Sequence, residues 1–382
     1  MFSLTADQRM LVATTTEFLD LHHPCSRARQ RYPNGEMPDA RFWQQGAELG
    51  WTSLLVSEAD GGGSISGDGL LELAALSAVF GGHAAPGALI GTNVVAAALT
   101  RWGSPEQRSG PLKELIAGSA TAAWCAAVTI DPWTDCGYRV TAATSDDAVV
   151  LNGSVACVEE AGNAEYLLVN AGERQLDSYY LISASSPGVV MTPLDGLDLT
   201  RRYWQVSLSN VSAPASATVG PIGTADRGNE TLTDIVATLH AAEIVGAMNH
   251  AVDTTLEWVQ DRYSFGRPLA AYQEIKHRMA DMRTVLQACA AVSERAALAV
   301  GRDAQNGSEI ASAAMAFVGT HGPEVVQDCI QLHGGIGVTA DHDLHVLLRR
   351  VVLAANVFAS AADFTQRLVG LIDTTEHEGH QG

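Results

Sequence analysis

The stretch DRYSFGRPLAAYQEIKHRMADM, residues 261–282, decides the fold that we expect for this chain. Gly266 and Pro268 favour a turn at which one helix ends and the next begins. Segments with helical periodicity and Ala- and Leu-rich faces surround this turn, at roughly 233–260, 271–301, 307–332 and 341–370. Long helices with short connections predict a four-helix bundle over residues 223–382.

Upstream of the bundle, the sequence changes to short β-rich runs. Between residues 121 and 222 these runs read AAWCAAVTI, AVVLNGSVACV, EYLLVNA, SYYLISA, GVVMTPL and YWQVSLSNV. Gly, Asn, Asp, Ser and Pro separate them, as is typical of strands joined by turns. The pattern predicts an antiparallel β domain over residues 121–222.

The first 120 residues indicate helices. Thr5 precedes an apolar-periodic run that extends to Leu21, and LLELAALSAVF at 70–80 has the same period and ends at a Gly-Gly pair. We therefore expect an all-α domain over residues 1–120.

Composition limits the possible functions. The chain has 382 residues, 47% of them hydrophobic, and a formal net charge of −20. Such a charge repels phosphate backbones and anionic lipid surfaces, so neither a nucleic acid nor a membrane is an expected partner. The N-terminus lacks the pattern of a signal peptide, and we expect a cytoplasmic protein.

Cysteine and histidine spacing does not indicate a metal site. The six cysteines form no CxxC pair, so we expect small buried hydrophobic residues in a reducing compartment. His333, His342 and His345 lie close together in the sequence, but no carboxylate or thiolate stands at matching spacing. We expect no metal.

Segments across nearly the whole chain resemble the acyl-CoA dehydrogenase family. They are AELGWTSLLVSEADGGG at 47–63, VVLNGSVACVEEAGNAEYLLVNA at 149–171, the 261–282 stretch, and QLHGGIGVTADHDLHVLLRR at 331–350. The resemblance implies the family's α+β fold, in which a helical N-terminal domain precedes a middle antiparallel β-barrel domain and a C-terminal four-helix bundle. It also implies FAD as cofactor, an acyl-CoA substrate and electron-transfer flavoprotein as acceptor.

The resemblance assigns FAD-binding roles to particular residues. Arg262 and Phe265 match the family's R-x-x-F-G motif, which contacts the FAD of a neighbouring subunit. Gln273 matches the glutamine that follows this motif. Gln331, Gly334 and Gly335 match the loop that meets the adenosine half of the flavin. A guanidinium suits pyrophosphate oxygens, and glycine permits close backbone approach. These roles imply an oligomer.

Both positions that hold the catalytic Glu in family members lack an acid here. One lies 26 residues before Arg262, at Val236, and the other falls at Ala359 or Ser360. Removal of the substrate α-proton requires a base, so a chain without an acid at either position lacks the family's usual proton acceptor. The β domain also departs from the family, because AVTIDPWTDCG (127–137) and ACVEEAG (156–162) replace its flavin-ring motifs.

The chain is therefore similar to the subunit without the base in the heteromeric α2β2 acyl-CoA dehydrogenases of steroid side-chain degradation. In that case a homologous partner chain carries the catalytic Glu. Two alternatives stay open at this point. One is a self-sufficient homotetramer with a relocated base, for which Glu243, two helical turns after Val236, is a candidate. The other is a flavin-free acyl-CoA-binding or scaffold protein.

Overall fold

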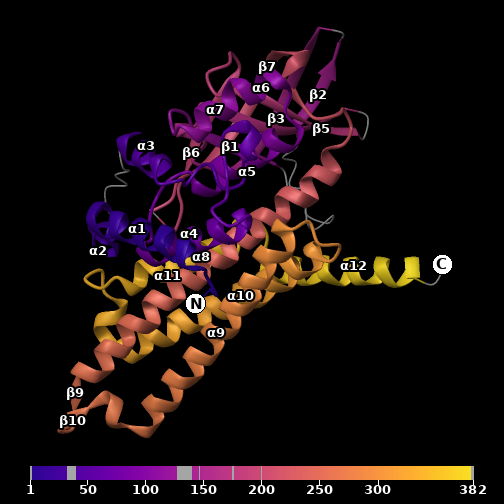
Figure 1. The fold of residues 1–382 in the computed structure, drawn as a ribbon. Helices are drawn as coiled ribbons and strands as arrows, with labels where there is room; N and C mark the ends of the chain where they lie inside the picture. Colours follow the sequence, from indigo (N-terminus) through magenta and orange to yellow (C-terminus); the bar gives the residue numbers. More distant parts are fainter. Residues whose placement is uncertain are drawn as a thin grey trace.

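A computed structural model describes residues 2–31, 40–126, 140–145, 147–173, 176–198 and 200–379. Figure 1 shows an N-terminal helical region beside a β-sheet, with a set of long helices below both. The long helix α8 runs from beneath the sheet to the far end of the bundle, where strands β9 and β10 lie (Figure 1).

The N-terminal region is helical, as predicted. Its helices are α1 Ala6–His22, α2 Cys25–Arg31, α3 Ala40–Glu48, α4 Gly69–His83, α5 Leu89–Trp102, α6 Pro105–Ser109 and α7 Pro111–Ile116. Thr5 begins α1 through a capping box with Gln8, in which each side chain binds the other residue's backbone N–H. Helices α4 and α5 are buried on nearly all sides and form the centre of this region.

The described residues of the middle region form one eight-stranded sheet. Its strands are β1 Ala122–Cys125, β2 Val140–Thr144, β3 Ala148–Glu159, β4 Tyr166–Glu173, β5 Leu176–Ser183, β6 Val189–Leu194, β7 Tyr203–Pro214 and β8 Thr218–Val219. The strand order is β6-β7-β3-β2-β4-β5-β8, and β1 pairs with β4. The longest ladder joins β3 and β7 in antiparallel register, with Val149 opposite Ala213.

The sheet corrects the expectation of an antiparallel barrel. In the described residues the path of strands ends at β6 and β8 and does not close on itself. Moreover, β1 and β2 both pair with β4 in parallel, so the sheet is mixed. Alternating polarity along a strand shows which face is buried, but it does not show which edges meet.

The C-terminal region differs from a simple four-helix bundle. Its helices are α8 Ala225–Asp261, α9 Gln273–Gly301, α10 Gly307–His333, α11 Leu344–Ala354 and α12 Ala361–Gly379. The predicted helix at 341–370 is therefore two helices. Ser360 starts α12, because its hydroxyl accepts the Asp363 N–H while the Asp363 carboxylate accepts the Ser360 N–H. Helix α12 packs on α10 and then projects to the side (Figure 1).

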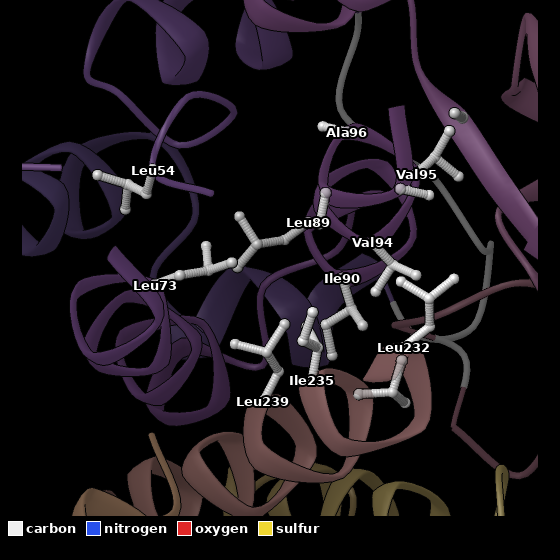
Figure 2. Close-up of a cluster of buried hydrophobic side chains, with 14 of the residues drawn as sticks. Leu54, Leu73, Leu89, Ile90, Val94, Val95, Ala96, Leu232, Ile235 and Leu239 are labelled. Carbon is white, nitrogen blue, oxygen red and sulfur yellow. The ribbon is translucent and has the colours of Figure 1, made fainter. Parts of the chain in front are cut away.

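Helix α8 connects the three regions. It packs against α4 on one side and against α9 and α10 on the other. Figure 2 shows Leu73 of α4, Ile90 of α5 and Ile235 of α8 within one buried cluster. The Gly228–Asp261 portion is long and apolar enough to cross a membrane, but 89% of its most apolar window is buried inside the fold. Packing therefore explains its apolar sequence.

The domain boundaries after residues 120 and 222 stay predictions. The described cysteines Cys25, Cys125, Cys289 and Cys329 are buried, as expected, whereas Cys157 is exposed.

Candidate functional site

The hairpin of β9 (Tyr263–Ser264) and β10 (Arg267–Pro268) carries the first predicted site residues. Arg262 ends α8, and its guanidinium lies 5.8 Å from the centre of the Trp258 ring. Among the described residues, no carboxylate lies within ion-pair distance of Arg262. Phe265 is 98% exposed and adopts a φ of +49°, a backbone conformation that is rare for a bulky residue. A fully exposed phenyl ring on a strained backbone is typical of a contact site for another molecule.

A second predicted loop lies beside the hairpin. The His333 ring at the end of α10 stacks on the Trp258 ring, with centroids 5.0 Å apart. Gly334 follows with φ +67° and ψ −143°, and its backbone N–H donates to the Gln331 carbonyl. A Cβ built on Gly334 would have no neighbouring atom within 4 Å, so a larger side chain would not clash with the protein here. The backbone conformation requires glycine, and the open surface leaves room for a ligand.

The predicted cofactor residues thus lie on the outside of the protomer. We call the following set the dinucleotide face: Arg262, Phe265, Gln273, Gln331, Gly334 and Gly335. All are exposed. The Trp258–His333 stack joins the hairpin to the Gly334 loop, and Gln273 begins α9 immediately after the hairpin. An unpaired guanidinium, an exposed ring and an open glycine loop fit the pyrophosphate and adenosine parts of FAD.

Val236, one of the positions expected to hold a catalytic acid, lines a small cavity. A cavity of about 70 Å³, which we call the ionic cavity, is lined by residues that include Trp124, Cys157, Glu159, Val236, His240 and Phe358. The Phe358 ring stacks on Trp124 with centroids 5.6 Å apart. Small-molecule sites are usually about 300–1,000 Å³, so this cavity is too small for a flavin ring with a thioester.

The structure gives packing or capping roles to Val236, Ala359 and Ser360. Val236 and Ala359 are buried apolar residues, and the Ser360 hydroxyl caps α12. None of the three side chains has a carboxylate that could accept a proton. The corresponding part of the β domain, 127–137, lies outside the described residues.

Glu243 lies next to the ionic cavity and is completely engaged. Its Oε1 atom accepts from Arg201 Nη2 at 2.6 Å and from Arg350 Nη1 at 2.8 Å. Its Oε2 atom lies 3.3 Å from His240 Nδ1. Glu243 and Arg350 are each 1% exposed. Burial alone would raise the pKa of Glu243, but Arg201 and Arg350 together with His240 hold that pKa well below its usual range. Such a carboxylate is a poor acceptor for a substrate proton, which supports a structural role.

The ionic network extends on both sides of Glu243. Arg201 also pairs with Glu159 at the end of β3. Arg350 also pairs with Asp198, whose second oxygen accepts from the Thr200 N–H at 2.9 Å. Burial and the nearby Glu159 raise the pKa of Tyr203 well above its usual range, so this phenol stays protonated. Glu159 and His240 line the ionic cavity and thereby connect it to this network of paired charges.

Sequence reasoning missed most members of this network. Glu159 was noted only as part of an altered motif, and Asp198, Arg201 and Arg350 were not singled out. Arg350 and Glu243 are 107 positions apart, so no local spacing indicates their contact.

The three histidines behave as packing residues. His333 Nδ1 donates to the Cys329 carbonyl at 2.8 Å. Burial lowers the pKa of His333, His342 and His345. His342 lies before α11, and His345 lies in its first turn. Across the described part of the chain, no group of three or more His, Cys, Asp or Glu side chains could hold a metal ion.

Comparison with known proteins adds to this geometry. Residues 5–119 match the family model described as acyl-CoA dehydrogenase, N-terminal domain, and residues 231–356 match acyl-CoA dehydrogenase, C-terminal domain. The chain is 27% identical to acyl-CoA dehydrogenase IpdE2 of Mycolicibacterium smegmatis, over 95% of this chain and 98% of that protein.

Solved structures show the same fold. The ChsE4-ChsE5 complex from Mycobacterium tuberculosis matches with a TM-score of 0.85 and 23% identity, over 98% of this chain and 99% of that chain. The Tcur3481-Tcur3483 steroid ACAD matches with a TM-score of 0.85 and 25% identity, over 97% and 99%.

Proposed function

Because this chain belongs to the acyl-CoA dehydrogenase family, whose cofactor is FAD, we propose that it is the subunit without a catalytic base in a heteromeric member of that family. In this proposal its dinucleotide face binds FAD that is shared with a homologous partner chain, and the partner chain carries the Glu. The complex removes hydrogen from the α and β carbons of an acyl-CoA thioester.

One asymmetry supports the proposal. The dinucleotide face is exposed and includes the strained, 98% exposed Phe265, whereas the ionic cavity measures only about 70 Å³. A protomer that carried out the reaction in its own site would need a larger cavity there. It would also need a carboxylate at Val236 or near Ala359. The exposed face is accessible to a second chain, and this supports the proposal.

Each residue of the dinucleotide face has a defined task in this proposal. Arg262 neutralises pyrophosphate oxygens, and its position over Trp258 limits the side-chain freedom that binding would remove. Gly334 and Gly335 allow the backbone to approach the adenosine half, and Phe265 covers part of the cofactor from water. FAD, when bound, provides the hydride acceptor, and the partner's Glu accepts the α-proton.

The names of the similar proteins suggest the substrate. One structural relative is a steroid ACAD, and another is a complex of two differently named chains. We propose a CoA ester of a steroid side chain as substrate, an α2β2 tetramer, electron-transfer flavoprotein as acceptor and a cytoplasmic location.

The experiment compares the chain alone with the chain co-expressed with a homologous chain that has a Glu at the position equivalent to Val236. We expect a colourless single chain and a yellow complex that oxidises an acyl-CoA. In the complex, Arg262→Ala should lower the flavin-to-protein absorbance ratio. The matched control Arg283→Ala removes an exposed arginine that pairs with Asp253 and should leave the ratio unchanged. A single chain that is yellow and turns over substrate would contradict the proposal.

A further inference from the structure

Three aromatic rings pack on one another beside the dinucleotide face. They belong to Trp258 of α8, His333 at the end of α10 and His342 just before α11. The Trp258 and His333 rings are stacked, with centroids 5.0 Å apart and planes 17° apart, and the His333 and His342 centroids are 4.5 Å apart. The Arg262 guanidinium lies 5.8 Å from the centre of the Trp258 ring. We call Trp258, His333 and His342 the ring stack.

The ring stack restrains the Arg262 side chain, whose main chain is fixed by hydrogen bonds. The Arg262 N–H donates to the Trp258 carbonyl at 2.9 Å, and the Arg262 carbonyl accepts from the Leu269 N–H at 2.8 Å. The side chain itself is exposed, and a long exposed side chain samples many rotamers unless a neighbour limits them. A guanidinium within about 6 Å of an indole centroid is attracted to the ring. Trp258 thereby favours the rotamers that keep the guanidinium beside it.

His333 supports the loop on the other side of the dinucleotide face. Its Nδ1 donates to the Cys329 carbonyl at 2.8 Å, which fixes the plane of the ring. The turn Gly334–Val338 folds back onto His333, because a Cβ at Gly337 would lie only 3.0 Å from the His333 Cβ. Glycine at this position permits the close approach. The turn therefore packs directly on the residue that stacks on Trp258.

His342 holds the far end of the ring stack. Its Nδ1 accepts from the N–H of Leu344, the first residue of α11, at 3.2 Å. Burial lowers the pKa of His333 and of His342, so the two rings meet as neutral groups. The ring stack thus connects the ends of α8 and α10 with the start of α11.

We propose that Trp258 and His333 are positioning residues for FAD, because their stacked rings couple the Arg262 side chain to the Gly334 loop and make the two contacts with the cofactor act together. The inference rests on the proposed function, in which Arg262 and the loop bind FAD. Trp258 is half-buried and His333 is 5% exposed, and this burial favours action through Arg262 and the loop. Contacts that are held in place before binding lose less entropy on binding, so the loss of either ring should weaken FAD affinity.

The test measures the FAD dissociation constant of the complex with the Glu-bearing chain. The flavin-depleted complex is titrated with FAD, and flavin fluorescence reports binding. His333→Leu should raise the dissociation constant about tenfold or more, since both contacts are released. His333→Phe keeps a ring at this place and should stay within about threefold of the wild type. As a matched control, Phe317→Leu removes the ring that contacts His321 elsewhere on α10 and should leave the constant unchanged.

A double-mutant cycle of His333→Leu with Arg262→Ala measures the coupling. In the Arg262→Ala background, His333→Leu should raise the dissociation constant by a factor at least about threefold smaller than in the wild type. Equal factors in the two backgrounds overturn the inference, and so does a His333→Phe variant that binds FAD as weakly as His333→Leu. If Arg262→Ala weakens FAD binding while His333→Leu does not, the positioning role alone is wrong. If Arg262→Ala has no effect, the proposed function is wrong as well.

A second pair of variants tests the same coupling from α8 if His333→Leu does not assemble. Weaker FAD binding in Trp258→Leu, with binding retained in Trp258→Phe, supports the inference, because only the second variant keeps a ring beside Arg262. FAD affinity that is retained in Trp258→Leu, or lost equally in both variants, overturns it.

Discussion

Glu243 shows how the role of one residue depends on its partners. It stands two turns after the position where related enzymes hold a base, and its sequence position alone made it a candidate. In the structure both its oxygens are used, by Arg201 and Arg350 on one atom and by His240 on the other. A buried ion pair of this kind is weak evidence for stability in itself, but removal of one partner is costly.

The first prediction concerns Glu243→Gln. At pH 7 we expect the free energy of unfolding to fall by about 3–5 kcal/mol, because two buried guanidinium groups lose their shared carboxylate. The folded-state pKa of Glu243 is depressed, so its contribution is present above the unfolded pKa of about 4.3 and is lost as the pH falls through the folded value. The difference from the wild type should therefore shrink below about pH 4.

Denaturant unfolding at pH 7, 5 and 3 measures this effect. Glu257→Gln changes an exposed carboxylate on the same helix and should shift the free energy of unfolding by less than about 0.5 kcal/mol. A Glu243→Gln deficit that stays constant from pH 7 to pH 3 would show that the charge is not its cause.

At the scale of elements, the β9–β10 hairpin contributes little to its own protomer. Tyr263 is 65% exposed and Phe265 is 98% exposed, so neither ring has a core to join. Loops that carry function are commonly the least stabilised parts of a fold. A substitution in this hairpin can therefore distinguish an effect on the assembly of the complex from an effect on the folding of the chain.

The second prediction concerns Phe265→Ser. We expect a change in the free energy of unfolding of the single chain of less than about 0.5 kcal/mol, since the ring makes no buried contacts. In the complex with a Glu-bearing chain, the same change should lower flavin retention. Thermal unfolding and flavin absorbance measure the two effects. Met10→Ser, which removes another exposed apolar side chain, should alter neither. Full flavin retention in Phe265→Ser would remove this residue from the dinucleotide face.

At the scale of the whole molecule, Arg350 connects all three regions. Its guanidinium donates to the Ala84 and Ala85 carbonyls after α4, to Asp198 in the β region and to Glu243 on α8. These contacts join segments that are 107 to 266 positions apart. Figure 1 shows α11 below the N-terminal helices and near α8, and α8 continues upward beneath the sheet.

The third prediction concerns Arg350→Met, which keeps an unbranched apolar stem but removes the guanidinium. We expect a loss of about 3–5 kcal/mol in stability and faster amide exchange around residues 84–88 and 200–203. Exchange inside α10 should change less. Arg283→Met, which breaks an exposed pair with Asp253, should cost at most about 1 kcal/mol. Exchange that accelerates equally everywhere would indicate global unfolding rather than a link between regions.

The amino-acid sequence alone predicts the order of the regions, because helical and strand periods depend on neighbouring residues. It also identified the family and named the residues of the dinucleotide face, since a motif such as R-x-x-F-G is local. The sequence contains a signal for the division of 341–370 into two helices, because Ser360 and Asp363 have the spacing of an N-terminal helix cap.

The folded structure is needed to show which edges of the sheet stay open, how small the ionic cavity is and which residues hold Glu243. Strand closure and cavity volume arise from packing between distant segments. The protonation of Glu243 depends on guanidinium groups 42 and 107 positions away, together with the burial that strengthens their effect. Interactions over such separations leave no periodic pattern in a single sequence, so they become visible only when the chain is folded.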